Sequence, residues 1–237
     1  MNCTKDKKQL TVIIPFLNEG IEVKSTVQNI KKWVGDRVHI IVINDCSDDG
    51  YDYETDMKGL GIEYVINRSR IGAARSKGLG VELSTTPYFL LLDAHMRFYD
   101  DKWVDILVDT LEQDDRRILC CQTKYLHKSG NRVYESIDPK ELRKRYGAFV
   151  NLNKEERILE PQWIFKEKEF GTISEKTPCI YGAGYSASKR YWDRLKGFQG
   201  LLGFGLEEAY ISIKAYLEGG CCLLMKKWNW MIISVIV

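Results

Sequence analysis

The sequence predicts an α/β protein whose mostly parallel sheet is flanked by helices, and three observations support this. Short runs rich in β-branched residues alternate with longer segments of helical periodicity, the pattern of successive βαβ units. Several of the apolar runs are continuous, as in strands that are buried on both faces. Polar clusters follow directly after the runs, as at the carboxyl ends of parallel strands. The 237 residues suffice for one well-cored domain, which we expect over 1–237.

The first half, residues 11–123, contains the predicted βαβ units. Strands are expected at 11–15, 38–43, 61–66, 88–92 and 118–123. A helix should open at Asn18-Glu19, because apolar residues then recur at helical spacing as far as Val34. Two more helices are expected at 71–83 and 103–111, and small residues in the former should allow close approach to the sheet.

The second half, residues 124–237, differs in composition and periodicity. Residues 124–176 are charged and aromatic with weak periodicity, which predicts an irregular insertion with one helix around 140–150. Such insertions commonly carry substrate-specific surfaces, where Trp163 and Phe165 either stack on a sugar or pack in the core. Order resumes at 179–187, and a helix at 207–218 and a strand in 231–237 are expected.

Composition limits the classes of partner. The formal net charge of +2 lacks the strong basic excess of a nucleic-acid binder. The seven cysteines show no zinc-ligand spacing and mostly lie in apolar runs, so we expect reduced thiols and a cytoplasmic location. Residues 1–8 lack the apolar core of a signal peptide, and no apolar run approaches the ~20 residues of a membrane helix.

The most informative feature is the apolar run 88–92, which ends in Asp93-Ala94-His95. Side chains alternate along a strand, so Asp93 and His95 should project to the same side. One carboxylate oxygen and one imidazole nitrogen suit Mn²⁺ or Mg²⁺ bridging a diphosphate. A solvated strand end with an incidental histidine is the alternative for this motif taken alone.

Three further polar clusters should lie along the same sheet edge, namely Asn18/Glu19, Asp45/Asp48/Asp49 and Arg68/Arg70/Arg75. Asp45 is placed to accept a hydrogen bond from a base or a ribose. Arg75 either neutralises a diphosphate or forms an ordinary surface salt bridge. The sequence has no Gly-x-Gly-x-x-Gly after the first strand and no P-loop, which argues against a dinucleotide or NTPase site.

The ordered motifs resemble those of family 2-type glycosyltransferases with a GT-A fold. They include 12–19 (VIIPFLNE), 44–50 (NDCSDDG), 72–78 (GAARSKG), 92–95 (LDAH), 182–187 (GAGYSA) with 196–198 (KGF), and the acidic helix that follows 203–208 (GFGLEE). Leu-Asp-Ala-His is similar to the motif of the polypeptide N-acetylgalactosaminyltransferases. The resemblance covers most of residues 11–220.

The resemblance implies a metal-dependent transfer of sugar from a UDP-sugar to an acceptor hydroxyl on a glycan or protein. Its implied donor-binding residues are Pro15, Asn18, Glu19, Asp45, Arg75, Asp93, Gly182, Ala183 and Gly184. Asp93 and His95 would bind the Mn²⁺ or Mg²⁺ on the diphosphate, and Asp45 would read the uracil. Glu207 or Glu208 occupies the position of the catalytic base; a solvated first helical turn is the equal alternative.

Two positions depart from the family pattern. Asn44 stands where many members have an acidic residue. Relatives with Asp-x-His also draw a further histidine ligand from a segment that corresponds to 226–232, which contains none here. A nucleotide-sugar-binding module without transfer activity therefore remains an alternative, as does a sugar-1-phosphate nucleotidylyltransferase, although its Gly-rich N-terminal loop is absent.

Overall fold

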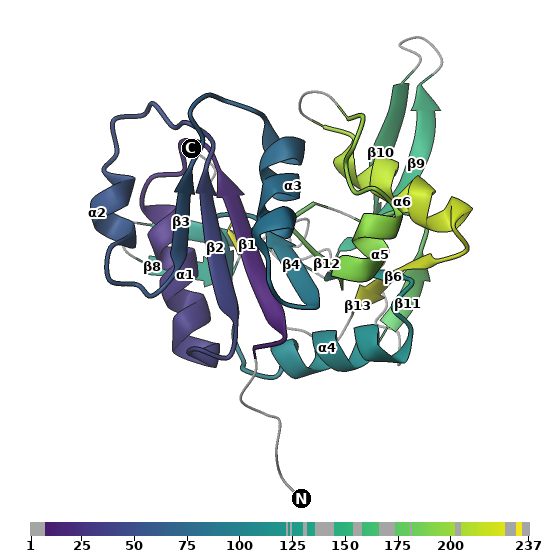
Figure 1. Ribbon diagram of the computed structural model, residues 1–237, viewed down its shortest axis with the longest axis horizontal. Coiled ribbons are helices and arrows are strands. Elements are labelled where there is room, and N and C mark those ends of the chain that lie inside the picture. The colour runs from purple at the N-terminus through teal and green to yellow at the C-terminus, as the bar shows by residue number, and fades with distance from the viewer. Residues whose placement is uncertain are drawn as a thin grey trace, which may run out of the picture.

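The computed structural model describes residues 8–121, 123, 125–129, 132–135, 145–153, 158–165, 174–180, 182–201, 205–225 and 231–233. At its centre lies an eight-stranded sheet in the order β11-β13-β6-β12-β4-β1-β2-β3 (Figure 1). Its strands are β1 (Leu10–Phe16), β2 (His39–Asn44), β3 (Glu63–Ile66), β4 (Tyr88–Leu92), β6 (Arg117–Cys121), β11 (Ser174–Thr177), β12 (Gly184–Ser188) and β13 (Cys221–Met225).

The sheet is parallel where the first half of the chain builds it. β4, β1, β2 and β3 pair in parallel, as predicted from their continuous apolar runs. β12 then inserts antiparallel between β4 and β6, and β6 pairs in parallel with β13. Segments from both predicted halves therefore share one sheet, and the predicted α/β class with a mostly parallel sheet is confirmed.

Helices flank this sheet (Figure 1). They are α1 (Ile21–Val34), α2 (Tyr53–Met57), α3 (Ala73–Leu83), α4 (Trp103–Gln113), α5 (Lys189–Arg194) and α6 (Glu207–Leu217). The predicted close approach of α3 to the sheet is real and depends on Gly80. A Cβ atom at Gly80 would lie 2.1 Å from Cγ2 of Ile13 in β1, so only glycine fits at this crossing.

The described parts of 124–176 are strands rather than an irregular segment. β7 (Tyr125–Ser129) and β8 (Arg132–Glu135) join β5 (Met96–Arg97) and β14 (Met231–Ile233) in a small sheet. β9 (Arg145–Asn153) pairs antiparallel with β10 (Ile158–Phe165). The helix predicted around 140–150 is therefore wrong over 145–150, because aromatic and β-branched residues there find a pairing partner in β10. Residues 140–144 lie outside the described residues, as do the side chains of Trp163 and Phe165.

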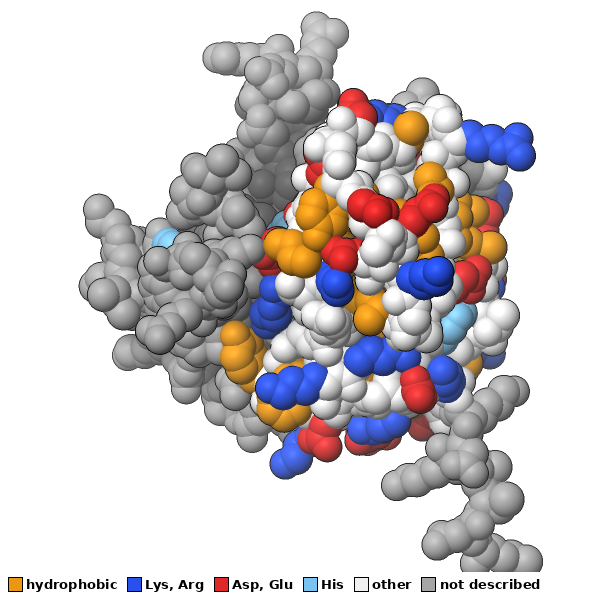
Figure 2. Space-filling model, turned by 90° about the vertical axis from the view of Figure 1, so that its left-hand side faces the viewer, with side chains coloured by type: hydrophobic (Ala, Val, Ile, Leu, Met, Phe, Trp, Pro, Cys, Tyr) orange, Lys and Arg blue, Asp and Glu red, His pale blue; other side chains and the backbone are white. Residues whose placement is uncertain are grey.

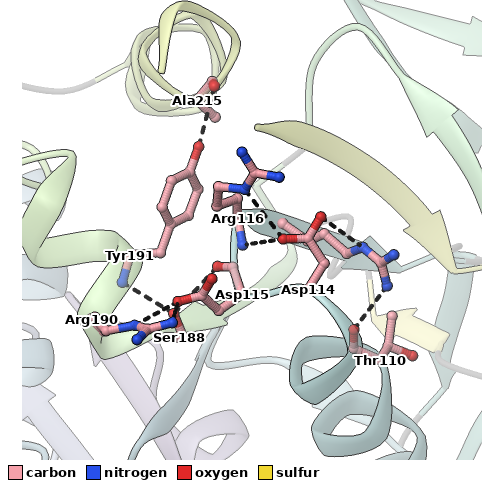
Figure 3. A network of polar contacts seen from close by, with 9 residues as sticks. Thr110, Asp114, Asp115, Arg116, Ser188, Arg190, Tyr191 and Ala215 are labelled. Atoms are coloured by element: carbon pink, nitrogen blue, oxygen red, sulfur yellow. Dashed lines mark hydrogen bonds and ion pairs between the residues drawn. The ribbon is translucent and has the colours of Figure 1, made fainter. Parts of the chain in front are cut away.

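A polar network fixes α5 and the far end of α6 against the turn between α4 and β6 (Figure 3). The Tyr191 hydroxyl donates to the Ala215 carbonyl at 3.2 Å, and its backbone N–H donates to Ser188 Oγ at 3.0 Å. Arg190 Nε donates to Asp115 Oδ2 at 2.6 Å. Through Tyr191, this network joins α6, whose first turn carries Glu207 and Glu208, to α5 and to the end of β12.

On the face shown in Figure 2, acidic and basic side chains are interspersed rather than gathered by sign. The six cysteines of the described ranges are free thiols, and four of them are buried. Among the helices within those ranges, none combines the length and apolarity needed to cross a bilayer.

Candidate functional site

The Asp-x-His motif lies at the carboxyl end of β4, beside the start of β12. The Asp93 N–H donates to the Ala183 carbonyl at 3.0 Å, which ties the motif to the glycine-rich segment 182–184. Gly184 then begins β12 and pairs with Leu92. Two motifs that are far apart in the sequence thus become one wall of a site.

His95 is held by Glu19, which comes from the loop between β1 and α1. The distance between His95 Nδ1 and Glu19 Oε2 is 3.2 Å. Burial opposes protonation of His95, but the hydrogen bond to Glu19 and the charge of Asp93 outweigh it, and its pKa is raised. Because Nδ1 is engaged by the carboxylate, Nε2 is the nitrogen left for a ligand.

Asp93 lacks full electrostatic compensation. Burial raises the pKa of its carboxyl, and the negative charges of Glu19 and Glu207 act in the same direction against Lys77 and His95. The described residues contain no group of three or more His, Cys, Asp or Glu side chains arranged to hold a metal ion. Asp93 and His95 as the protein donors for a cation here stay a prediction from the sequence.

Asp45, at the end of β2, is surrounded by donors. Its Oδ1 accepts from Asn67 Nδ2 at 2.8 Å and from the Ile71 N–H at 2.9 Å, and its Oδ2 accepts from the Gly72 N–H at 2.9 Å. Burial would raise the pKa of this carboxyl, but the hydrogen bonds outweigh it and the pKa is lowered. Asp45 therefore fixes the loop that starts α3, and Oδ2 retains capacity for one more donor.

Pro15 lies within β1, and the loop that follows this strand is hydrogen-bonded to the loop after β2. Asn18, at φ 58°, donates from Nδ2 to Asp48 Oδ1 at 2.9 Å and accepts from the Asp48 N–H at 2.9 Å. Arg70 forms an ion pair with the same Asp48 carboxylate. The structure thus brings Asn18, Asp48 and Arg70 together. Their contacts join the loops next to Asp45 and Glu19.

Glu208 lies directly against the glycine-rich segment. A Cβ atom at Gly182 would be 2.4 Å from Glu208 Oε1, so a larger residue would displace this carboxylate. Burial raises the pKa of Glu208, and the negative charge of Glu207 adds to this effect while Lys77 opposes it. The side chain of Glu208 keeps 16% of its surface exposed against 3% for Glu207, so Glu208 is the more accessible of the pair.

Lys77 is a member of the site that the sequence did not single out. It lies on the buried face of α3, and its Nζ is 3.7 Å from Glu208 Oε1 and 4.0 Å from Glu207 Oε1. The motif 72–78 contains this lysine, but the resemblance implies a functional role for Arg75 instead. The sequence does carry a signal for Lys77, which is a charged residue on the helix face that otherwise consists mostly of small residues.

Arg75 lies elsewhere. Its side chain is exposed, and it lines a cavity of about 640 Å³ between α3 and residues 192–201. That cavity is lined by neither Asp93 nor His95, and neither Glu207 nor Glu208 borders it. The structure therefore does not bring Arg75 into the acidic cluster formed by the other predicted site residues.

Comparisons with known proteins identify the family of the chain. Residues 11–184 match the family described as glycosyl transferase family 2. The chain is 25% identical over 145 residues to the uncharacterized glycosyltransferase YibD of Escherichia coli (strain K12), covering 60% of this chain and 41% of that protein. It is 25% identical over 225 residues to human polypeptide N-acetylgalactosaminyltransferase 14, covering 92% of this chain and 39% of the relative. The chain thus spans about two fifths of either relative.

Solved structures have the same fold. GalNAc-T7 with UDP, GalNAc and Mn²⁺ superimposes with a TM-score of 0.74 at 18% identity, covering 98% of this chain and 45% of that one. The mannosyltransferase PcManGT from Pyrobaculum calidifontis, in complex with GDP-Man and Mn²⁺, gives a TM-score of 0.64 at 14% identity, covering 97% and 57%. The fold is therefore the one seen in these GT-A glycosyltransferase structures. This chain belongs to glycosyl transferase family 2.

Proposed function

We propose that the protein transfers a sugar from a UDP-sugar to an acceptor hydroxyl and that a divalent cation, Mn²⁺ or Mg²⁺, assists the reaction. The observation that carries this proposal is the position of Asp93 and His95 at the end of β4, against Ala183 and beside the acidic first turn of α6. The acceptor we propose is a glycan or a protein.

The residues present fit a divalent cation. Asp93 offers an oxygen whose negative charge its neighbours leave undercompensated, and His95 offers Nε2 because Nδ1 is engaged by Glu19. A histidine ligand held by a carboxylate in this way is common among protein metal sites. When bound, the cation would neutralise the diphosphate charge that develops as the leaving group departs.

A carboxylate in the first turn of α6 would accept the proton. We assign Glu208 as the base: the acceptor O–H gives its proton to the Glu208 carboxylate while the acceptor oxygen forms a bond to the anomeric carbon. The bond from that carbon to the diphosphate oxygen breaks, and its electron pair leaves with UDP. The raised pKa of Glu208 favours this role, because a base works best with a pKa close to the working pH.

The nucleotide would lie over β1 and β2. Asp45 keeps capacity at Oδ2 for one donor, such as the N3–H of uracil. Pro15 near the end of β1 and the following loop with Asn18 and Glu19 would flank the base. The backbone of Gly182, Ala183 and Gly184 would approach the sugar. Arg75 would bind the donor from outside the acidic cluster, at the cavity between α3 and residues 192–201.

A screen of UDP- and GDP-sugars tests the proposal. Hydrolysis or transfer should occur with a UDP-sugar, should require added Mn²⁺ or Mg²⁺, and should be lost in Asp93→Ala and His95→Ala. Equal turnover in the two variants and the wild type would refute the metal assignment. Binding of UDP without turnover would favour the nucleotide-sugar-binding module, and incorporation of label from a nucleoside triphosphate would favour a nucleotidylyltransferase.

A further inference from the structure

Lys77 occupies an unusual environment for a lysine. It lies on the face of α3 that also buries Ala74, Ser76 and Gly80, and its side chain is only 10% exposed. A lysine is almost never buried to this extent without a counter-charge, because removing an ammonium group from water is costly. The contacts of Lys77 therefore indicate why a lysine occupies this position.

The counter-charges come from the opposite wall of the site. Lys77 Nζ lies 3.7 Å from Glu208 Oε1 and 4.0 Å from Glu207 Oε1, and 5.5 Å from the centre of the Tyr185 ring. Both carboxylates belong to the first turn of α6, so the ammonium group of α3 faces the acidic helix across the site. Both distances exceed a hydrogen bond, so Lys77 acts on these carboxylates through its charge.

Glu208 is confined from two sides. Gly182 lies so close that a Cβ atom there would meet Oε1 at 2.4 Å, and the ammonium group of Lys77 attracts the same oxygen. Without Lys77, the carboxylates of Glu207, Glu208 and Asp93 would face one another with less compensation, since each of the other two raises the pKa of Glu208. Repulsion would then turn the Glu208 carboxylate away from its place over Gly182.

We propose that Lys77 is a positioning residue, whose ammonium group holds the Glu208 carboxylate over Gly182 in the orientation that sugar transfer requires. This inference rests on the proposed function, in which Glu208 accepts the acceptor proton. Lys77 acts through Glu208 rather than on the reacting atoms. A salt bridge that merely joins α3 to α6 would stabilise the fold without this effect on turnover.

A double-mutant cycle between Lys77 and Glu208 tests the inference. Lys77→Met should lower kcat by about 10- to 100-fold, the cost of a misplaced catalytic group, with a change in donor KM of less than about threefold. Lys77→Arg should restore most of the rate, because it keeps the charge. In a Glu208→Gln background, Lys77→Met should cost little more, because the group that it positions has already been neutralised.

The matched control is Lys24→Met, which removes an ion pair with Asp56 (2.7 Å) between α1 and α2, two helices that carry none of the proposed site residues. It should leave kcat unchanged. A kcat in Lys77→Met equal to the wild type, a loss confined to KM, or full additivity with Glu208→Gln would overturn the inference.

A second readout separates this inference from the proposed function. The same four proteins of the cycle are melted without donor, and Lys77→Met should lower Tm more in the wild-type background than in Glu208→Gln. This coupling is measurable even if no sugar is transferred, in which case the proposed function alone fails. Equal changes of Tm in both backgrounds would show that Lys77 does not hold Glu208 and would overturn the inference.

Discussion

Two carboxylates at the same sheet edge have opposite environments. Asp45 accepts three hydrogen bonds from Asn67, Ile71 and Gly72, and its pKa is lowered. Asp93 is raised in pKa by burial and by neighbouring negative charge. Hydrogen bonds within the protein therefore stabilise the charge of Asp45, whereas the electrostatics around Asp93 favour an added positive charge. Glu208 resembles Asp93 in this respect.

The largest effect is expected at Glu208, which like Asp93 lies among other negative charges. Glu208→Gln should lower kcat by about 100- to 10,000-fold, because it removes the base. The wild-type kcat should fall as the pH drops through the raised pKa of Glu208, and this acidic limb should vanish in the variant. Glu218→Gln, at the exposed far end of α6, is the control and should retain activity. An unchanged acidic limb in Glu208→Gln would assign the proton acceptance to another group.

A stability measurement tests Asp45, the carboxylate that is hydrogen-bonded within the protein. Asp45→Ala should lower the free energy of unfolding by about 3 kcal/mol, because it leaves the buried donor of Asn67 and the part-buried N–H groups of Ile71 and Gly72 without their acceptor. Since the folded-state pKa is lowered, this stabilisation is present above the unfolded pKa and is lost as the pH falls through the folded value. Urea denaturation at neutral and acidic pH measures both. Asp48→Ala, an exposed neighbour, should cost much less, and equal losses would contradict the contrast.

Glu19 should affect the proposed cation site indirectly, through its contact with His95. Glu19→Ala should weaken Mn²⁺ binding by about 10- to 100-fold, as for other carboxylates that hold a histidine ligand. Titration calorimetry measures the affinity. Glu63→Ala, which removes the carboxylate 3.5 Å from His39 in β2, is the matched control. Unchanged Mn²⁺ affinity in Glu19→Ala would show that Glu19 does not support the ligand.

The smallest effect is expected at Arg75. Because its exposed side chain lines the cavity beside residues 192–201, Arg75→Ala should leave the Mn²⁺ affinity within about twofold of the wild type and Tm nearly unchanged. Any effect should fall on donor or acceptor KM, which steady-state kinetics would measure. A large loss of Mn²⁺ affinity would place Arg75 in the acidic cluster after all.

The sequence predicts the sheet and the placement of the polar strand ends well, for physical reasons. Continuous apolar runs identify buried strands, and the polar residues at their ends meet because parallel strands end at one edge. It fails at 145–150, where pairing with β10 decides the conformation. It also passes over Lys77 in favour of Arg75, because the sequence does not show which face of α3 meets α6. Donor and acceptor specificity remain predictions for the same reason, since they depend on contacts between distant segments.

The most direct test of the central claim is Mn²⁺ binding in the presence of UDP, measured by titration calorimetry on the wild type and on Asp93→Asn. We expect about one ion per chain in the wild type and loss of binding in the variant. The variant should melt at the same or a higher temperature, because a group with a raised folded-state pKa loses stabilisation as the pH rises through that value, and the amide avoids this loss. Equal binding by both proteins, or no binding by the wild type, would contradict the account.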